Sequence, residues 1–146
     1  QAFKPVAGRL SPLRLSSGAL LVDDSYNANP GSVRAAIDVL ASLPGPRTLI
    51  LGDMAELGDE AANLHGSLGD YAGTRGIERV WSTGNLSRHV TERARLKGCD
   101  CEHFDDFQGL VAALHRLDLT SGTLLIKGSR SAGMDRAVKA LQDGEK

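Results

Sequence analysis

The chain has 146 residues, of which 41% are hydrophobic, so it can bury one substantial core and suits a single domain. Its 17 basic and 18 acidic side chains are interspersed and nearly cancel, which argues against a surface for nucleic acid. The apolar runs are too short to cross a bilayer, and no charged segment leads into a secretory signal, so we expect a cytoplasmic protein.

The first 18 residues interrupt any long helix or strand, because prolines, glycines and a Ser-Ser-Gly turn recur in them. The chain also begins at Gln1, without an initiator methionine. We therefore expect residues 1–18 to be a linker from a preceding domain and residues 19–146 to form the folded unit.

Five β-rich segments then alternate with five helical segments, which is typical of an α/β fold with an open, mainly parallel sheet and helices on both faces. The expected strands cover residues 19–22, 48–51, 79–82, 101–104 and 123–126. Their apolar stretches are continuous, as expected where both faces of a strand are buried.

The helical segments carry apolar residues at helical spacing, and each such face is expected to pack on the sheet. These residues are Val33, Ala36, Ile37 and Leu40, then Leu64, Leu68 and Tyr71, then Leu110, Val111, Leu114 and Leu117, and finally Met134, Ala137, Val138 and Leu141. The weakest helix covers residues 86–97, where arginines and a lysine cluster. We interpret this charge run as a solvated helix face and not as a binding patch.

Polar residues gather directly after the first expected strand, where ligands bind in open parallel sheets. Asn29 is explained as a helix N-cap, because a proline follows at the first helical position. Capping does not explain the adjacent Asp23 and Asp24, which could hold Mg²⁺ through water or orient a ligand hydroxyl. Tyr26 and Asn27 could stack on a purine and hydrogen-bond to it. The alternative is a polar turn that only ends the strand.

The second strand leads into a loop with further carboxylates at the same edge of the sheet. The two acids before the next helix are explained as favourable first-turn charges, but Asp53 is not. Gly52 and Gly58 indicate a close backbone approach or a positive φ. His65 lies one residue off the apolar stripe of the following helix, so a buried structural histidine and a functional one both remain open.

The last strand ends in a group of cations and hydroxyls at the start of the final helix. Lys127, Ser129, Arg130 and Ser131 suit an anion, either a phosphate or a peptide carboxylate, although a serine here is also explained as an N-cap. No segment matches the glycine-rich phosphate loop, because the order of lysine, glycine and serine is reversed here.

Two cysteines and a histidine lie close together around the fourth expected strand. Cys99, Cys101 and His103 lack the spacing and the second ligand pair of a zinc module. We expect reduced thiols and no bound metal ion at these residues.

Taken together, the polar strings resemble those of the Mur ligase family. The matching strings are Gly8-Arg9, Asp23 to Pro30 with Ser32, Leu51 to Met54 with Glu56-Leu57-Gly58 and His65, and Lys127 to Ser131 with Met134. They occur in the family order and cover nearly the whole chain. The resemblance implies the third, Rossmann-like domain of a three-domain ligase whose central domain carries the phosphate loop.

Within that family, the second and last strings are typical of the member that joins D-alanyl-D-alanine to UDP-N-acetylmuramoyl-tripeptide through an acyl phosphate. The resemblance therefore implies a cytoplasmic, monomeric enzyme of peptidoglycan synthesis. It implies ATP and Mg²⁺ as cofactors, both held mainly by the central domain. This domain would act only when docked on the central one, so the chain alone is expected to be inactive.

The resemblance also implies roles for individual residues. Arg9 matches a linker arginine that reaches the transferred phosphate, although sequence alone would favour a solvated charge. Asp24, with Asp23 as the second choice, matches an aspartate near the nucleotide. The residues implied to border adenine and ribose are Tyr26, Asn27 and Asn29, and those implied to face the dipeptide or the closed cleft are Asp53, His65, Lys127, Ser129 and Arg130.

Two alternatives belong beside this hypothesis. One is a free-standing nucleotide- or ligand-binding module without catalysis. The other is a sibling ligase that adds a different amino acid. The selection between a tripeptide ending in lysine and one ending in diaminopimelate is expected to lie in the other domains.

Overall fold

The computed structural model describes residues 12–143, and Arg9 therefore lies outside the described residues. The strands are β1 (Pro12–Arg14), β2 (Leu20–Asp24), β3 (Arg47–Leu51), β4 (Arg79–Thr83), β5 (Asp100–Phe104) and β6 (Thr123–Lys127). The α-helices are α1 (Pro30–Ala41), α2 (Ala61–Thr74), α3 (Arg88–Leu96), α4 (Phe107–Leu114) and α5 (Asp135–Asp143). Two short 3₁₀ helices, η1 (Gly58–Glu60) and η2 (Arg130–Ala132), precede α2 and α5.

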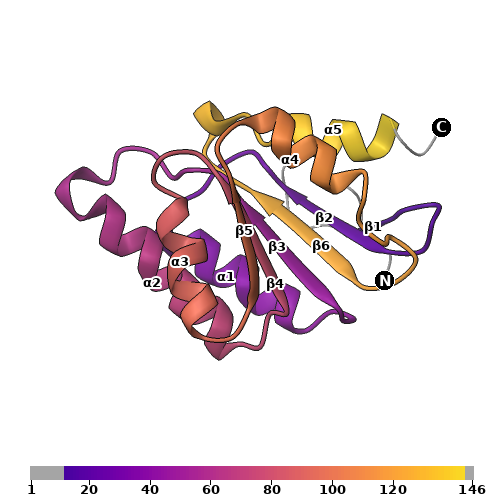
Figure 1. Cartoon of the computed structure of the whole chain (residues 1–146), viewed down its shortest axis with the longest axis horizontal. Helices are drawn as coiled ribbons and strands as arrows, with labels where there is room; N and C mark the ends of the chain where they lie inside the picture. Colours follow the sequence, from indigo (N-terminus) through magenta and orange to yellow (C-terminus); the bar gives the residue numbers. More distant parts are fainter. Residues whose placement is uncertain (1–11, 144–146) are drawn as a thin grey trace.

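The strands form one sheet in the order β1-β2-β6-β3-β4-β5. All neighbours from β2 to β5 are parallel, and β1 pairs antiparallel with β2. The helices α1, α2 and α3 cover one face of the sheet, and α4 and α5 cover the other (Figure 1). The predicted α/β fold is confirmed, and each of the five predicted strands overlaps an observed one.

The two edge strands differ from what the sequence predicts. The strand β1 was not predicted; it is only three residues long and begins with Pro12 at the sheet edge, a position where proline is tolerated. The other edge strand, β5, is not buried on both faces. Asp100 and Glu102 are exposed while the residues between and after them are partly or fully buried, because β5 is an edge strand of the described sheet and α3 packs on it closely while α4 contacts it only weakly.

The core consists of two apolar layers separated by the sheet. Alternate residues of one strand face opposite layers, as Ile50 packs toward α4 and α5 while its neighbours Leu49 and Leu51 pack toward α1 and α2. This arrangement explains the continuous apolar runs of the central strands. Among residues 12–143, no helix is long and apolar enough to cross a membrane.

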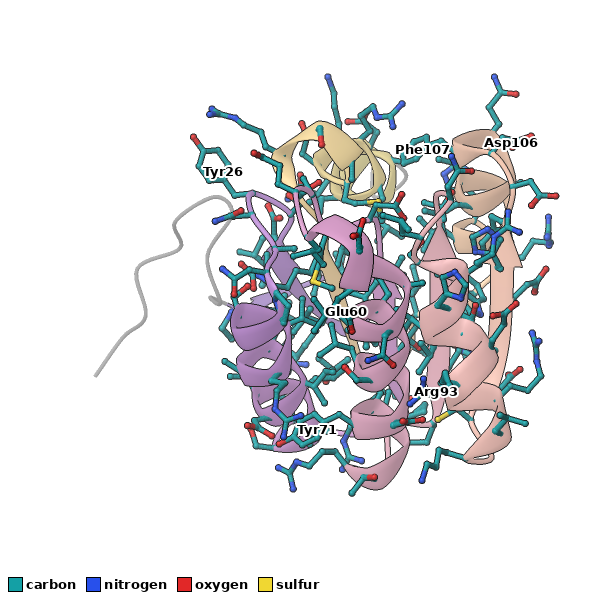
Figure 2. The ribbon with its side chains drawn as sticks, turned by 90° about the vertical axis from the view of Figure 1, so that its left-hand side faces the viewer. Tyr26, Glu60, Tyr71, Arg93, Asp106 and Phe107 are labelled. Carbon is teal, nitrogen blue, oxygen red and sulfur yellow. The ribbon has the colours of Figure 1, made fainter. Side chains whose placement is uncertain are left out.

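The helices α2 and α3 approach each other unusually closely. A Cβ atom added at Gly69 of α2 would lie 2.1 Å from the carbonyl oxygen of Val90 in α3. At the same interface Arg93 of α3 forms an ion pair with Asp70 of α2 (Figure 2). Part of the predicted solvated face of α3 is therefore used to hold the two helices together.

Candidate functional site

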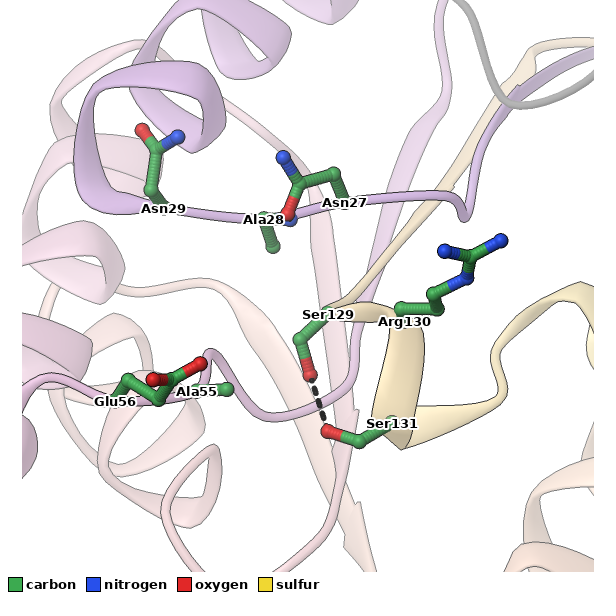
Figure 3. A pocket seen from close by; sticks show the side chains of 8 residues that line it. All are labelled: Asn27, Ala28, Asn29, Ala55, Glu56, Ser129, Arg130 and Ser131. Atoms are coloured by element: carbon green, nitrogen blue, oxygen red, sulfur yellow. Dashed lines mark hydrogen bonds between the residues drawn. The ribbon is translucent and has the colours of Figure 1, made fainter.

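A pocket of about 510 Å³ lies at the carboxyl ends of β2, β3 and β6 (Figure 3). Its lining comes from the segments that follow these strands, namely Asn27, Ala28, Asn29, Ala55, Glu56, Ser129, Arg130 and Ser131. The central strand β6 leads to a helix on one face of the sheet, whereas its neighbours β2 and β3 lead to helices on the other. Loops diverge at such a point, and open α/β sheets bind ligands in the resulting crevice.

Two glycines at the strand ends allow the chain to pack tightly beneath this pocket. A Cβ atom at Gly52 would lie 2.7 Å from Cγ of Met134, and one at Gly128 would lie 2.6 Å from the same atom. Met134 itself is completely buried. The close backbone approach predicted at Gly52 is confirmed, and Met134 fixes the end of β3 against the end of β6.

A buried ion pair joins β2 to β6 next to the pocket. Asp24 and Lys127 are direct partners in the register of the two strands, and Lys127 Nζ donates to Asp24 Oδ2 at 2.7 Å. The same ammonium donates to the carbonyl oxygen of Asn27 at 2.8 Å, so it also holds the loop after β2. Burial raises the pKa of the Asp24 carboxyl above its usual range, and Lys127 offsets only part of that increase.

The loop after β2 is held by its own side chains. Asn29 caps α1, since its side-chain oxygen accepts from the Ser32 amide at 2.9 Å and Ser32 Oγ accepts from the Asn29 amide at 3.0 Å. Pro30 is the first residue of the helix, as predicted. Asn27 accepts from the amide of Ala28 at 2.9 Å. The two asparagines therefore reach the pocket wall on a fixed loop.

Tyr26 and Arg130 form a contact at the rim of the pocket. The Arg130 guanidinium donates to the Tyr26 hydroxyl at 3.0 Å and lies 4.9 Å from the centre of the ring. Tyr26 is 58% exposed as a residue, and Figure 2 shows its side chain at the same end of the molecule as Phe107. A large exposed aromatic beside a cation offers a surface on which a flat ligand can stack.

Asp53 is engaged within the protein. Its carboxylate accepts the backbone amides of Leu86 and Ser87 at 2.8–3.2 Å, just before α3, and its carbonyl oxygen accepts the Ser129 amide at 3.0 Å. Asp53 thus connects the ends of β3, β4 and β6. Its predicted contact with a dipeptide stays a prediction, and the contacts present are structural.

His65 is also used internally. The residue is 1% exposed, its Nε2 accepts the Met54 amide at 3.0 Å, and its Nδ1 lies 2.7 Å from the Ala61 carbonyl oxygen. These two bonds fix Nδ1 as the protonated nitrogen. Of the two interpretations of His65, the geometry favours the structural one, in which His65 anchors the loop after β3.

One serine lies beside a histidine away from the pocket. Ser82 Oγ is 2.7 Å from His103 Nδ1, and His103 Nε2 is 3.9 Å from Asp105. Ser82 is completely buried, however, and its hydroxyl also contacts Thr91 at 3.0 Å. The group is a polar connection between β4, β5 and α3 and does not present a nucleophile.

The predicted site residues therefore differ in where they lie and in what they contact. Four of them line the pocket, and these are Asn27, Asn29, Ser129 and Arg130. Tyr26 lies at the rim, while Asp24, Lys127, Asp53 and His65 hold the surrounding segments. Asp23 accepts from both the amide and the hydroxyl of Ser25. Arg9 lies outside the described residues.

Sequence reasoning gave no role to Glu56, which lines the pocket. Its backbone has φ of +59°, in the left-handed region that glycine usually occupies. Nothing in the local sequence marks this conformation, although Glu56 belongs to one of the strings that carry the family resemblance. The positive φ predicted at Gly58 is confirmed, with a value of +70°.

Comparison with known proteins gives consistent results. The UDP-N-acetylmuramoyl-tripeptide--D-alanyl-D-alanine ligase of Escherichia coli strain K12 is 48% identical over 97% of this chain. The ligase of the same name from Bacillus subtilis strain 168 is 33% identical over 95% of it. A crystal structure of MurF from Acinetobacter baumannii superposes with a TM-score of 0.86 at 30% identity, over 96% of this chain and 31% of that one.

The chain matches only part of each of these proteins, because it spans 31% of the length of both ligases. A sequence model of the family described as "Mur ligase, glutamate ligase domain" matches residues 8–130, which contain every strand that the structure describes and all of the pocket lining except Ser131. The chain thus belongs to the Mur ligase family and corresponds to the C-terminal domain of its members.

Proposed function

We propose that this domain belongs to an ATP-dependent ligase that joins D-alanyl-D-alanine to UDP-N-acetylmuramoyl-tripeptide in peptidoglycan synthesis. The observation that carries the proposal is the pocket where the connections after β2, β3 and β6 diverge, in a chain that is 48% identical to a ligase of this name over 97% of its length. In this proposal residues 1–18 connect to a central ATPase domain, with which residues 19–146 close over the reactants in one cytoplasmic, monomeric protein.

The nucleotide side of the site would be the loop after β2. Tyr26 offers an exposed ring, and Asn27 and Asn29 present polar side chains on a fixed backbone. These groups suit adenine and ribose better than phosphates, because they carry no positive charge. ATP would supply the phosphoryl group that activates the tripeptide carboxylate, and a MurF ligase from Thermotoga maritima, which is 24% identical to this chain, was crystallised with ADP.

The carboxylates after β2 do not fit a direct role as Mg²⁺ ligands. Asp24 is already bonded to an ammonium, and Asp23 is bonded to Ser25. Among residues 12–143, no group of three or more histidine, cysteine or acidic side chains is arranged to hold a metal ion. We infer that Asp24 acts with Lys127 as a positioning pair for the loop and that any Mg²⁺ is held by the central domain.

The dipeptide side would be the turn after β6. Ser129 and Ser131, whose hydroxyl oxygens are 3.1 Å apart, and Arg130 offer hydrogen bonds and one cation to a carboxylate. Lys127 would contribute indirectly, because its ammonium is buried and bonded to Asp24. Asp53 and His65 would keep the facing loops in place.

A coupling assay tests this proposal. The full-length ligase that carries this domain should release ADP from ATP only when both UDP-N-acetylmuramoyl-tripeptide and D-alanyl-D-alanine are present. The isolated chain should couple nothing and should bind ATP weakly in calorimetry, because the phosphate contacts lie elsewhere. Tight ATP binding by the isolated chain would favour a free-standing binding module. Turnover with another amino acid, and none with the dipeptide, would identify a sibling ligase.

A further inference from the structure

Glu56 adopts a backbone conformation that costs free energy. Among residues 12–143 it is the one non-glycine residue with positive φ, at +59°. For a residue with a Cβ atom this region is less favourable than right-handed conformations, because the Cβ atom lies too close to the following carbonyl oxygen. Gly58, two residues later, shows that the same loop uses glycine where only the backbone matters. A side chain kept at position 56 despite this cost is a candidate for a function of its own.

The side chain of Glu56 faces the pocket. Figure 3 shows it on the wall opposite the turn that carries Ser129, Arg130 and Ser131. The residue is exposed, and within the described part of the chain its carboxylate has no hydrogen-bond or ion-pair partner. Asp53, three residues earlier, is instead fully engaged by backbone amides. Glu56 is therefore available to a ligand.

The charges of the pocket are few and lie on opposite walls. Glu56 is the acid and Arg130 the base among the lining residues, and the other six are uncharged. Tyr26 holds the Arg130 guanidinium at the rim of the pocket, on the side away from Glu56 (Figure 3). A pocket with one anion and one cation at separate points suits a ligand with both charges. A polyphosphate placed beside Glu56 would be repelled.

We propose that Glu56 determines specificity by receiving the protonated α-amine of the incoming dipeptide, while the turn from Ser129 to Ser131 with Arg130 receives its carboxylate. This inference rests on the proposed function, which makes the dipeptide a substrate. A free α-amine has a pKa of roughly 8, so most of the dipeptide carries both charges at neutral pH. The two walls then fix its direction in the pocket.

The test uses steady-state kinetics of the full-length ligase with the substitution Glu56→Gln. This variant keeps the size of the side chain and removes its charge. The KM for D-alanyl-D-alanine should rise by roughly 10-fold or more, the effect of losing a charge-assisted hydrogen bond. The KM values for ATP and for the tripeptide should stay within about twofold. Glu60→Gln is the matched control, since Glu60 is exposed in η1 and does not line the pocket.

Two further measurements separate recognition from a loss of structure. N-acetyl-D-alanyl-D-alanine lacks the positive charge, so the wild-type enzyme should bind it more weakly than the dipeptide, and Glu56→Gln should abolish that difference. Glu56→Gly relieves the backbone cost and should unfold at a higher temperature than the wild type, yet it should show the same rise in KM.

The outcomes distinguish this inference from the proposed function. The role of Glu56 would be overturned if the KM for the dipeptide were unchanged in both variants, or if only the KM for ATP rose. The proposed function would still stand in that case, provided that the wild-type enzyme couples the dipeptide. Failure of the wild-type ligase to couple D-alanyl-D-alanine would overturn the function itself, and this inference with it.

Discussion

The substitution Lys127→Met is expected to destabilise the chain through the charge that it leaves behind. The side chains of Lys127 and Asp24 are only 3% and 11% exposed, so water cannot replace the ammonium that is lost. Breaking a buried pair by removing one partner costs about 3–5 kcal/mol. The Asn27 carbonyl loses its bond to the same ammonium, which adds to this cost.

The stability lost in Lys127→Met should depend on pH in a defined direction. Burial already raises the pKa of Asp24 in the native protein, and removal of Lys127 raises it further. A raised native pKa means that the folded variant holds a proton that the unfolded chain releases near pH 4. The variant should therefore lose stability as the pH rises from about 4 through this raised pKa. The difference from the wild type should be larger at pH 8 than at pH 5.

Urea unfolding of the 146-residue chain, followed by circular dichroism at both pH values, measures this difference. The double variant Lys127→Met with Asp24→Leu is the control, because an apolar pair removes the uncompensated charge and should recover most of the loss. If Lys127→Met lowered the free energy of unfolding by less than about 1 kcal/mol at pH 8, or by the same amount at both pH values, the ion pair of Asp24 and Lys127 would not contribute to stability through its charges.

Three other predictions concern packing, capping and thiol chemistry. Gly69→Ala should lower the free energy of unfolding by about 1–3 kcal/mol, because the new Cβ atom would lie 2.1 Å from the Val90 carbonyl oxygen. The control is Gly31→Ala, where the nearest atom to the new Cβ lies at 3.5 Å, and its midpoint of thermal unfolding should be close to that of the wild type. Asn29→Ala removes the cap of α1 and should cost about 1 kcal/mol in urea unfolding; an unchanged midpoint would contradict the capping role. Burial raises the pKa of Cys101 to about 11, so iodoacetamide at pH 8 should modify it roughly 100-fold more slowly in the folded chain than in 6 M urea, as followed by mass spectrometry.

The fold followed from the sequence because the apolar pattern is strong in the central strands and in most helices. Strands such as β3 and β6 are buried on both faces, and their runs of apolar residues record that directly. The edges carried less information. The three residues of β1 pair with β2 through backbone bonds, and such bonds leave no pattern in side-chain type.

The site was predictable in position but not in the use of each side chain. Polar residues after strands were expected at one edge of the sheet, and the pocket lies there. Which of them meet one another depends on strand register. That Asp24 opposes Lys127 follows from the pairing of β2 with β6, and that Asp53 meets the start of α3 follows from the pairing of β3 with β4. The backbone angle of Glu56 likewise depends on the folded loop.

The central place of β6 has a consequence for the order in which this protein can be assembled. Of the strands within residues 12–143, β6, which separates β2 from β3, is the last to be synthesised, and the ion pair that joins it to β2 spans 103 positions of the chain. Until β6 arrives, the inner edges of β2 and β3 have no partner, and contacts over such separations close slowly. A nascent or truncated chain that ends before Thr123 therefore exposes two unpaired apolar strand edges, which favour aggregation.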